Sequence, residues 1–228
     1  MFQKFDLNQI FVMIVPLLFA VTVHEVAHGY VAWKMGDDTA KRAGRLTLNP
    51  IKHLDFIGSF LLPIILKLSG SPVLFGYAKP VPVNFANLRD YRKGTIYVAS
   101  AGVAANMVLA IISSIFFQIM LHLGDLWFDS ILRPVLLDLF LILGYSVVIN
   151  LVLAIFNLIP IPPLDGSRIL AVFLPMPLRA KFERLEPFGM LIIIVLLMIN
   201  ALSFLISFFL TPLLILLLGN RGIAFIFG

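Results

Sequence analysis

Four stretches of this 228-residue chain are apolar over unusually long distances, at about residues 7–35, 94–123, 131–159 and 188–218. A helix needs about 20 apolar residues to cross a hydrocarbon layer of roughly 30 Å, and each stretch is long enough. With 61% hydrophobic residues and a mean hydropathy of +1.03, the chain carries more apolar surface than a soluble core of this size could bury. The sequence therefore predicts an all-α polytopic membrane protein embedded in the lipid bilayer.

A fifth apolar run, at 54–66, is short and contains Gly58 and Pro63, which favours a re-entrant or interfacial segment over a span. With four spans, 14 Lys and Arg residues fall in the loops at 34–93 and 161–188, against three on the other side. A fifth crossing would make that split 10 to 7. The positive-inside rule thus favours about four spans with these loops in the cytosol. Five or six spans are the alternatives, since the last stretch contains Pro212 and could hide a hairpin.

The loop at 71–86 is rich in Gly and Pro, and its segments 73–77 and 81–84 are predicted as short strands of a small membrane-associated β-hairpin. The region 54–86 would therefore hold both the re-entrant segment and the hairpin. The net charge of +5 does not indicate nucleic-acid binding, because basic loops beside apolar spans are ordinary in membrane proteins. The first stretch is too long for the apolar part of a signal peptide, so we expect it to be retained.

The first predicted span contains the pattern HExxH, as His24-Glu25-Val26-Ala27-His28. Residues four apart share one face of a helix, so the two imidazoles can bind one cation. In zinc hydrolases with this pattern, the glutamate holds the attacking water as general base. Ionisable residues within a membrane helix are costly and normally have a function there. The pattern predicts a catalytic metal site with His24 and His28 as ligands and Glu25 as base.

Two histidines leave a zinc hydrolase one protein ligand short, with water in the fourth position. Asp165 is the favoured candidate, because it follows the third span and the four-span topology brings that end next to the HExxH helix. Prolines before it unwind the helix end, and Gly166 is expected to let the backbone turn inward. The alternatives are a turn-capping role for Asp165, with Asp55 or, less favoured, His53 as the ligand.

Five segments of the chain resemble motifs of the site-2 protease family of intramembrane zinc metalloproteases. They are HExxH, Asn-Pro-Ile-Lys-His-Leu-Asp at 49–55, Lys-Pro-Val-Pro-Val-Asn at 79–84, Ala-Gly-Val-Ala-Ala-Asn at 101–106, and Asn-Leu-Ile-Pro-Ile-Pro-Pro-Leu-Asp-Gly at 157–166. The resemblance covers nearly the whole chain and is closest to short prokaryotic members without PDZ or CBS domains. One departure is Val103, where the family usually has proline.

The resemblance implies one zinc ion, Asp165 as its third ligand, and cleavage of transmembrane protein substrates from a site near the cytosolic side of the cell membrane. Residues 1–228 would then form a single membrane-embedded metalloprotease domain. It also suggests that Asn106 and Asn157 bind the substrate backbone or a developing oxyanion. The alternative for both is interhelical hydrogen bonding, which is common for asparagine in membranes. The β element would present the substrate as an extended strand.

A different class of protein, a zinc-binding membrane transporter or scaffold without proteolytic activity, could use the same ligands. A metal transporter is expected to place ligand clusters at several depths, and apart from isolated Asp138 the sequence offers one cluster. An inactive relative would usually lose Glu25 or a histidine, and both are retained. The sequence therefore favours the protease; substrate identity and oligomeric state do not follow from it.

Overall fold

The computed structural model describes the chain except residues 1–6, 56–57, 59–60, 62–77, 128 and 228. Within the described residues, four helices are long and apolar enough to cross a membrane. They are α1 (Leu7–Lys34), α4 (Tyr91–His122), α6 (Arg133–Leu158) and α10 (Ala201–Phe227). The first three agree with the predicted spans to within three residues. The prediction of a helical protein with about four spans is confirmed.

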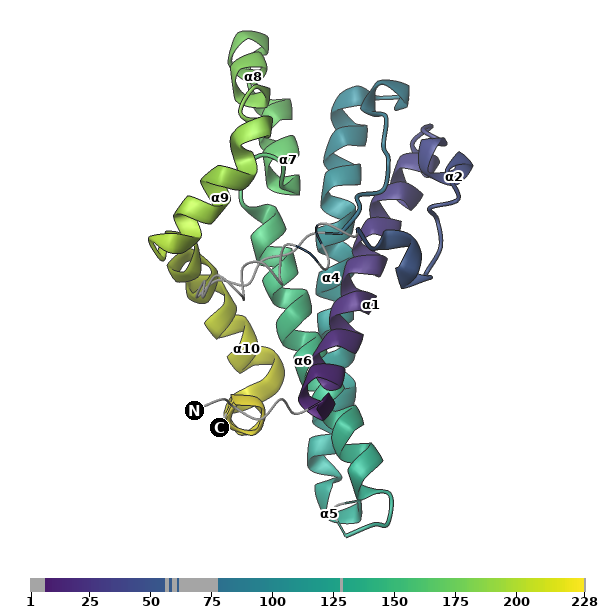
Figure 1. The fold of residues 1–228 in the computed structure, drawn as a ribbon, viewed down its shortest axis with the longest axis vertical. Helices are drawn as coiled ribbons and strands as arrows, with labels where there is room; N and C mark the ends of the chain where they lie inside the picture. The colour runs from purple at the N-terminus through teal and green to yellow at the C-terminus, as the bar shows by residue number, and fades with distance from the viewer. Residues whose placement is uncertain (1–6, 56–57, 59–60, 62–77, 128, 228) are drawn as a thin grey trace.

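Helices α1, α4 and α6 pack on one another, and α10 lies against α6 and α4 (Figure 1). The short helix α5 (Gly124–Trp127) lies between α4 and α6 at one end of the molecule. Helices α1 and α6 therefore run in the same direction. Both end where Figure 1 shows the short helices α2 (Thr39–Arg42), α7 (Asp165–Phe173) and α8 (Met176–Glu183). This arrangement brings the segment after α6 close to the C-terminal half of α1.

The last apolar stretch is not one continuous helix, so the single span predicted at 188–218 is wrong. After η4 (Glu186–Phe188), helix α9 covers only Gly189–Met198, and Asn200 has a left-handed backbone with φ 59°. Asparagine tolerates this conformation better than most residues and often ends helices. Helix α10 then extends to Phe227, with non-helical backbone at Gly219. At about 1.5 Å per residue, α9 alone is too short to cross the hydrocarbon layer.

The predicted β-hairpin is not supported, because residues 81–84 form no strand and are followed by a 3₁₀ turn, η3 (Phe85–Asn87). Pro80 and Pro82 explain this, since proline has no N–H to donate to a β-ladder. The other predicted strand, 73–77, lies outside the described residues. So does most of the predicted re-entrant segment 54–66, and its few described residues, which follow η1 (Pro50–His53), do not support one.

A hydrophobic cluster holds α4, α6 and α10 together away from α7. The rings of Phe117 and Phe140 stack with centroids 4.3 Å apart, and both side chains are fully buried. Hydroxyl groups add contacts between helices: Ser113 and Ser146 oxygens lie 2.8 Å apart, and Ser114 donates to the Leu217 carbonyl. Such polar contacts are favourable in membranes, where no water competes for them.

Candidate metal centre

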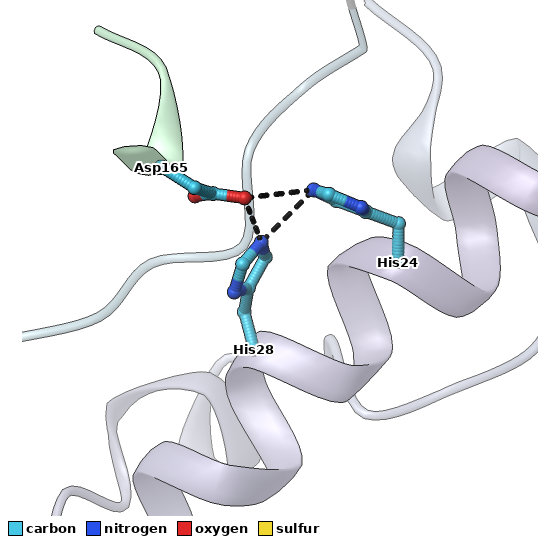
Figure 2. Close-up of side chains that lie close together, drawn as sticks. All are labelled: His24, His28 and Asp165. Carbon is cyan, nitrogen blue, oxygen red and sulfur yellow. Dashed lines mark hydrogen bonds and ion pairs between the residues drawn. The ribbon is translucent and has the colours of Figure 1, made fainter. Parts of the chain in front are cut away.

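Three side chains from two distant segments meet beside α1 (Figure 2). The Nε2 atoms of His24 and His28 lie 3.0 Å apart, and Asp165 Oδ2 lies 3.3 Å from the first and 3.1 Å from the second. Both histidines are buried and Asp165 is nearly so. Among the described residues this is the group whose His, Asp and Glu ligand atoms could hold a metal ion.

Helix α1 supplies the two imidazoles from one face, as the spacing of four residues predicts. His28 lies about 9 Å and His24 about 15 Å along the helix from Lys34, the last helical residue, at about 1.5 Å per residue. His28 Nδ1 lies 2.7 Å from the Val98 carbonyl of α4, which can only accept a hydrogen bond. A neutral His28 therefore carries its proton on Nδ1 and turns the lone pair of Nε2 toward His24 and Asp165.

Gly102 of α4 makes room for these rings. A Cβ atom at this position would lie 2.5 Å from His28 Nε2 and 2.6 Å from His24 Cε1. Real Cβ contacts are essentially never that short, so any side chain here would displace the imidazoles. Gly102 is part of the segment 101–106 that the sequence singled out, but the sequence does not show which face of α4 meets α1.

Asp165 is the first residue of α7, which starts directly against the end of α6. A Cβ on Gly166 would lie 2.1 Å from the Leu158 carbonyl oxygen, so only glycine allows this approach. Gly166 is helical and does not have a positive φ, so the predicted turning of the chain at this glycine is wrong. Burial acts to raise the pKa of the Asp165 carboxyl, but hydrogen bonds and positive charge from His24 and His28, when these are protonated, outweigh it and lower the pKa to about 2. With neutral imidazoles, a bound cation would have to take over this stabilisation of the carboxylate.

The donor set fits zinc. Ligand atoms held at roughly 2.0–2.1 Å from a tetrahedral zinc ion lie about 3.3 Å apart, close to the separations of these three atoms. Asp165 Oδ2 is also buried, and with neutral imidazoles it has no hydrogen-bond partner among the described residues. Lone pairs that converge in a buried site repel one another unless a proton or a cation lies between them. Two neutral imidazoles and one carboxylate are the ligand types of many zinc hydrolases.

Glu25 lies next to this group on α1 without belonging to it. Its side chain is half-buried, and its Oε2 accepts a hydrogen bond of 2.7 Å from the backbone N–H of Val81. This contact ties α1 to the segment 79–84, about 55 residues further along the chain. The sequence predicted neither this N–H donor nor the Val98 carbonyl, because backbone partners leave no mark in the identity of a side chain.

The two asparagines predicted to contact substrate differ in their surroundings. Asn106 is fully buried, and neither its side-chain oxygen nor its nitrogen has a partner within the described part of the chain. It follows Gly102 by four residues and therefore shares the face of α4 that meets the imidazoles. Asn157 is half-buried, and its amide donates to the Leu153 carbonyl of its own helix, 3.0 Å away.

The competing ligand candidates lie elsewhere. His53 is buried, with Nε2 2.9 Å from the Thr47 carbonyl oxygen. The Oδ1 atom of Asp55 accepts a hydrogen bond from the Gly58 N–H. Neither residue belongs to the described ligand group.

Helices long and apolar enough to span a membrane, with two histidines and an aspartate gathered at one point, are the features of a metal-dependent membrane protein. The chain belongs to peptidase family M50, the site-2 protease family, whose sequence pattern matches residues 12–200. It is 39% identical over 195 residues to YwhC of Bacillus subtilis, covering 86% of this chain and 84% of that protein. It is 31% identical over 195 residues to Rip2 of Mycolicibacterium smegmatis, covering 85% and 70%. Both relatives are named as zinc metalloproteases. No solved structure matches the chain significantly.

Family and fold together identify an intramembrane zinc metalloprotease with several membrane-spanning helices. The family implies substrates that are themselves membrane proteins. The transporter or scaffold alternative is not favoured, because both relatives carry protease names and the described residues offer a single metal-ligand group.

Proposed function

We propose that this protein hydrolyses peptide bonds in or near the transmembrane helices of its substrates, using one zinc ion per chain held by His24, His28 and Asp165. The convergence of three buried ligand atoms within 3.3 Å of one another carries the proposal. Asp165 reaches the histidines from a segment more than 130 residues away, which supports a selected site over a chance HExxH pattern. A zinc ion bound there would supply Lewis acidity to a peptide carbonyl and to water.

Glu25 is proposed as the general base. As the residue after His24 in the HExxH pattern, it is placed to take a proton from the attacking water and to deliver it to the leaving amine. The Val81 N–H binds Oε2, so Oε1 is the oxygen proposed to exchange the proton. Proton transfer by Oε1 requires a carboxylate, because an amide at the same position cannot accept and return a proton.

Asn106 and Asn157 are proposed to bind the substrate backbone or to stabilise the developing oxyanion. The unpartnered, buried amide of Asn106 supports this role, since leaving such a group without a hydrogen bond costs about 1–3 kcal/mol. The support for Asn157 is weaker, because its amide already bonds to its own helix.

We place the protein in the cell membrane, with its active site near the cytosolic side. The helices α2, α7 and α8, which follow α1 and α6, lie at one end of the molecule, and the loops after α1 and α6 contain most of the Lys and Arg residues of the sequence. Water would reach His28 from that side across about two turns of α1. A helical substrate has its carbonyls in hydrogen bonds, so it must unwind locally before hydrolysis.

Cleavage of a single-span reporter protein in liposomes tests the proposal, with wild type compared with Glu25→Gln at known zinc content. The variant should retain zinc and lose activity by about 10²–10⁴-fold or more. Substantial cleavage by Glu25→Gln would contradict the base assignment. Zinc binding by the wild type without any cleavage of membrane substrates would favour the transporter or scaffold.

A further inference from the structure

Residues 79–84, which we call the strap, cross α1 at the HExxH motif. The backbone N–H of Val81 donates to Glu25 Oε2 at 2.7 Å. The Val81 side chain packs on the same helix one turn later: a Cβ at Gly29 would lie 2.8 Å from Val81 Cγ1. The strap is therefore fitted to α1 by close packing as well as by the hydrogen bond to Glu25.

The start of the strap is tied down by a buried arginine. Arg45 is only 8% exposed, and its Nη2 donates to the Lys79 carbonyl at 2.8 Å. The Lys79 N–H in turn donates to the His53 carbonyl at 2.9 Å. Burying a guanidinium is costly unless it is hydrogen-bonded, so a buried Arg45 is expected to depend on its bond to the strap.

The other end of the strap is held by a buried carboxylate. Asp37 is fully buried just after α1, and its Oδ2 accepts from the Asn84 N–H at 2.8 Å. Its Oδ1 accepts from the Asn87 side chain at 2.9 Å and also from Thr39. Burial acts to raise the pKa of Asp37, but hydrogen bonds from Thr39, Asn87 and Asn84 outweigh it and hold the pKa below its usual range. The anchor is thus a carboxylate at neutral pH, which makes its hydrogen bonds charge-assisted.

The prolines stiffen the strap between its two anchors. Pro80 and Pro82 fix their own φ near −65° and favour extended backbone in the residue before each, which includes Val81. They also remove two N–H groups, so the strap cannot offer a regular ladder of donors to another strand. Its conformation is better suited to holding one N–H in place than to binding a substrate strand along that edge.

We propose that the strap is a positioning element for Glu25, and that Arg45 and Asp37 are the positioning residues that hold it. The inference rests on the proposed function, in which Glu25 is the base. A glutamate side chain has three rotatable bonds, and a hydrogen bond that holds Oε2 restricts the positions that Oε1 can take. The chemistry depends on such placement, because small displacements of a catalytic group lower the rate strongly.

The N–H of Val81 can be removed with little other change. Val81→Pro deletes the donor, and replacing Val81 by its α-hydroxy acid analogue deletes it while keeping the side chain. Val81→Ala is the matched variant that loses the side-chain packing but keeps the donor. A hydrogen bond to a charged group is worth about 1.5–3 kcal/mol. The kcat of the two variants that lack the N–H should therefore be about 10–100-fold below that of Val81→Ala. KM for the reporter and zinc content should be similar in all three.

The two anchors, Arg45 and Asp37, are tested by substitutions that remove their hydrogen bonds to the strap, with Arg45→Lys as the conservative control. Arg45→Met and Asp37→Ala should lower kcat more than KM rises, and Arg45→Lys should recover part of the loss because lysine can still donate to the Lys79 carbonyl. A purely structural role predicts instead that kcat per folded, zinc-loaded molecule stays at the wild-type value.

The outcomes separate this inference from the proposed function. If Glu25→Gln is inactive but kcat without the Val81 N–H equals that of Val81→Ala, the strap does not position the base and only this inference fails. If kcat rises when the N–H is removed, the strap blocks Glu25 and the inference is likewise overturned. If Glu25→Gln itself is active, the base assignment fails and the inference fails with it.

Discussion

Helix α4 takes part in two regions that are packed in different ways. Near its start, around Gly102, it makes room for the imidazoles of α1, accepts a hydrogen bond at the Val98 carbonyl and buries the unpartnered Asn106. About 22 Å further along, at about 1.5 Å per residue, it places Phe117 among the aromatic and aliphatic side chains of α6 and α10. We call these regions the metal end and the aromatic end.

The difference indicates where stability and activity reside. Packing at the aromatic end consists mainly of apolar contacts, with stacked rings and interhelical hydroxyl contacts. The metal end instead collects buried polar atoms that lack partners, namely Asp165 Oδ2 and both polar atoms of the Asn106 side chain. Such groups destabilise a folded state unless a ligand satisfies them. Substitutions at the metal end should therefore reduce activity, and those at the aromatic end should reduce stability.

Of three substitutions that compare the two ends of α4, Asn106→Ala should have the largest effect, with kcat lowered by about 10²–10³-fold, as for loss of an oxyanion donor. The melting temperature should stay the same or rise, because the substitution removes a buried amide without a partner. Thermal unfolding in detergent, measured beside reporter cleavage, separates the two roles. A lower melting temperature with full activity would mean that Asn106 only joins helices.

Phe117→Ala should have the opposite profile. We expect a loss of about 2–3 kcal/mol in unfolding free energy, at or below the low end for such truncations, because lipid also solvates the exposed apolar groups. Zinc content and kcat per folded molecule should match wild type. Loss of zinc from folded Phe117→Ala protein would show that the two regions are not independent.

The smallest of the three effects is predicted for Gly102→Ala, which adds one methyl group against the histidines. Changes beside metal ligands typically lower metal affinity or activity by 10–100-fold, and we expect about that decrease in zinc affinity. Competition with a zinc chelator measures it. Unchanged affinity would mean that the imidazoles can move aside without leaving the metal.

Hydropathy predicted the positions of α1, α4 and α6 within three residues, because long apolar runs in this chain have few other ways to fold. It failed at Asn200, where one polar residue in an apolar run breaks the helix. The hairpin prediction also failed, although Pro80 and Pro82 were visible in the sequence and argue against a β-ladder. Lipid and protein are similarly apolar, so hydrophobicity does not show which face of a membrane helix meets its neighbours.

The sequence revealed those parts of the site that depend on local spacing or on the order of the spans. The spacing of His24, Glu25 and His28 is local, so a helix alone brings them to one region. Proximity of Asp165 followed from the parallel course of two spans. Three further contacts with the HExxH residues depend on how the helices and the strap pack together, which no local pattern encodes. They are made by Gly102, the Val98 carbonyl and the Val81 N–H.

The metal content of three purified variants tests the central claim most directly, that the metal end binds zinc through His24, His28 and Asp165. Asp165→Ala removes the anionic ligand, whereas His53→Ala and Asp55→Ala alter the competing candidates, neither of which belongs to the described ligand group. We predict that Asp165→Ala loses zinc and all cleavage, and that the other two retain about one zinc ion per chain. Zinc retained by Asp165→Ala and lost from Asp55→Ala would contradict this account of the site.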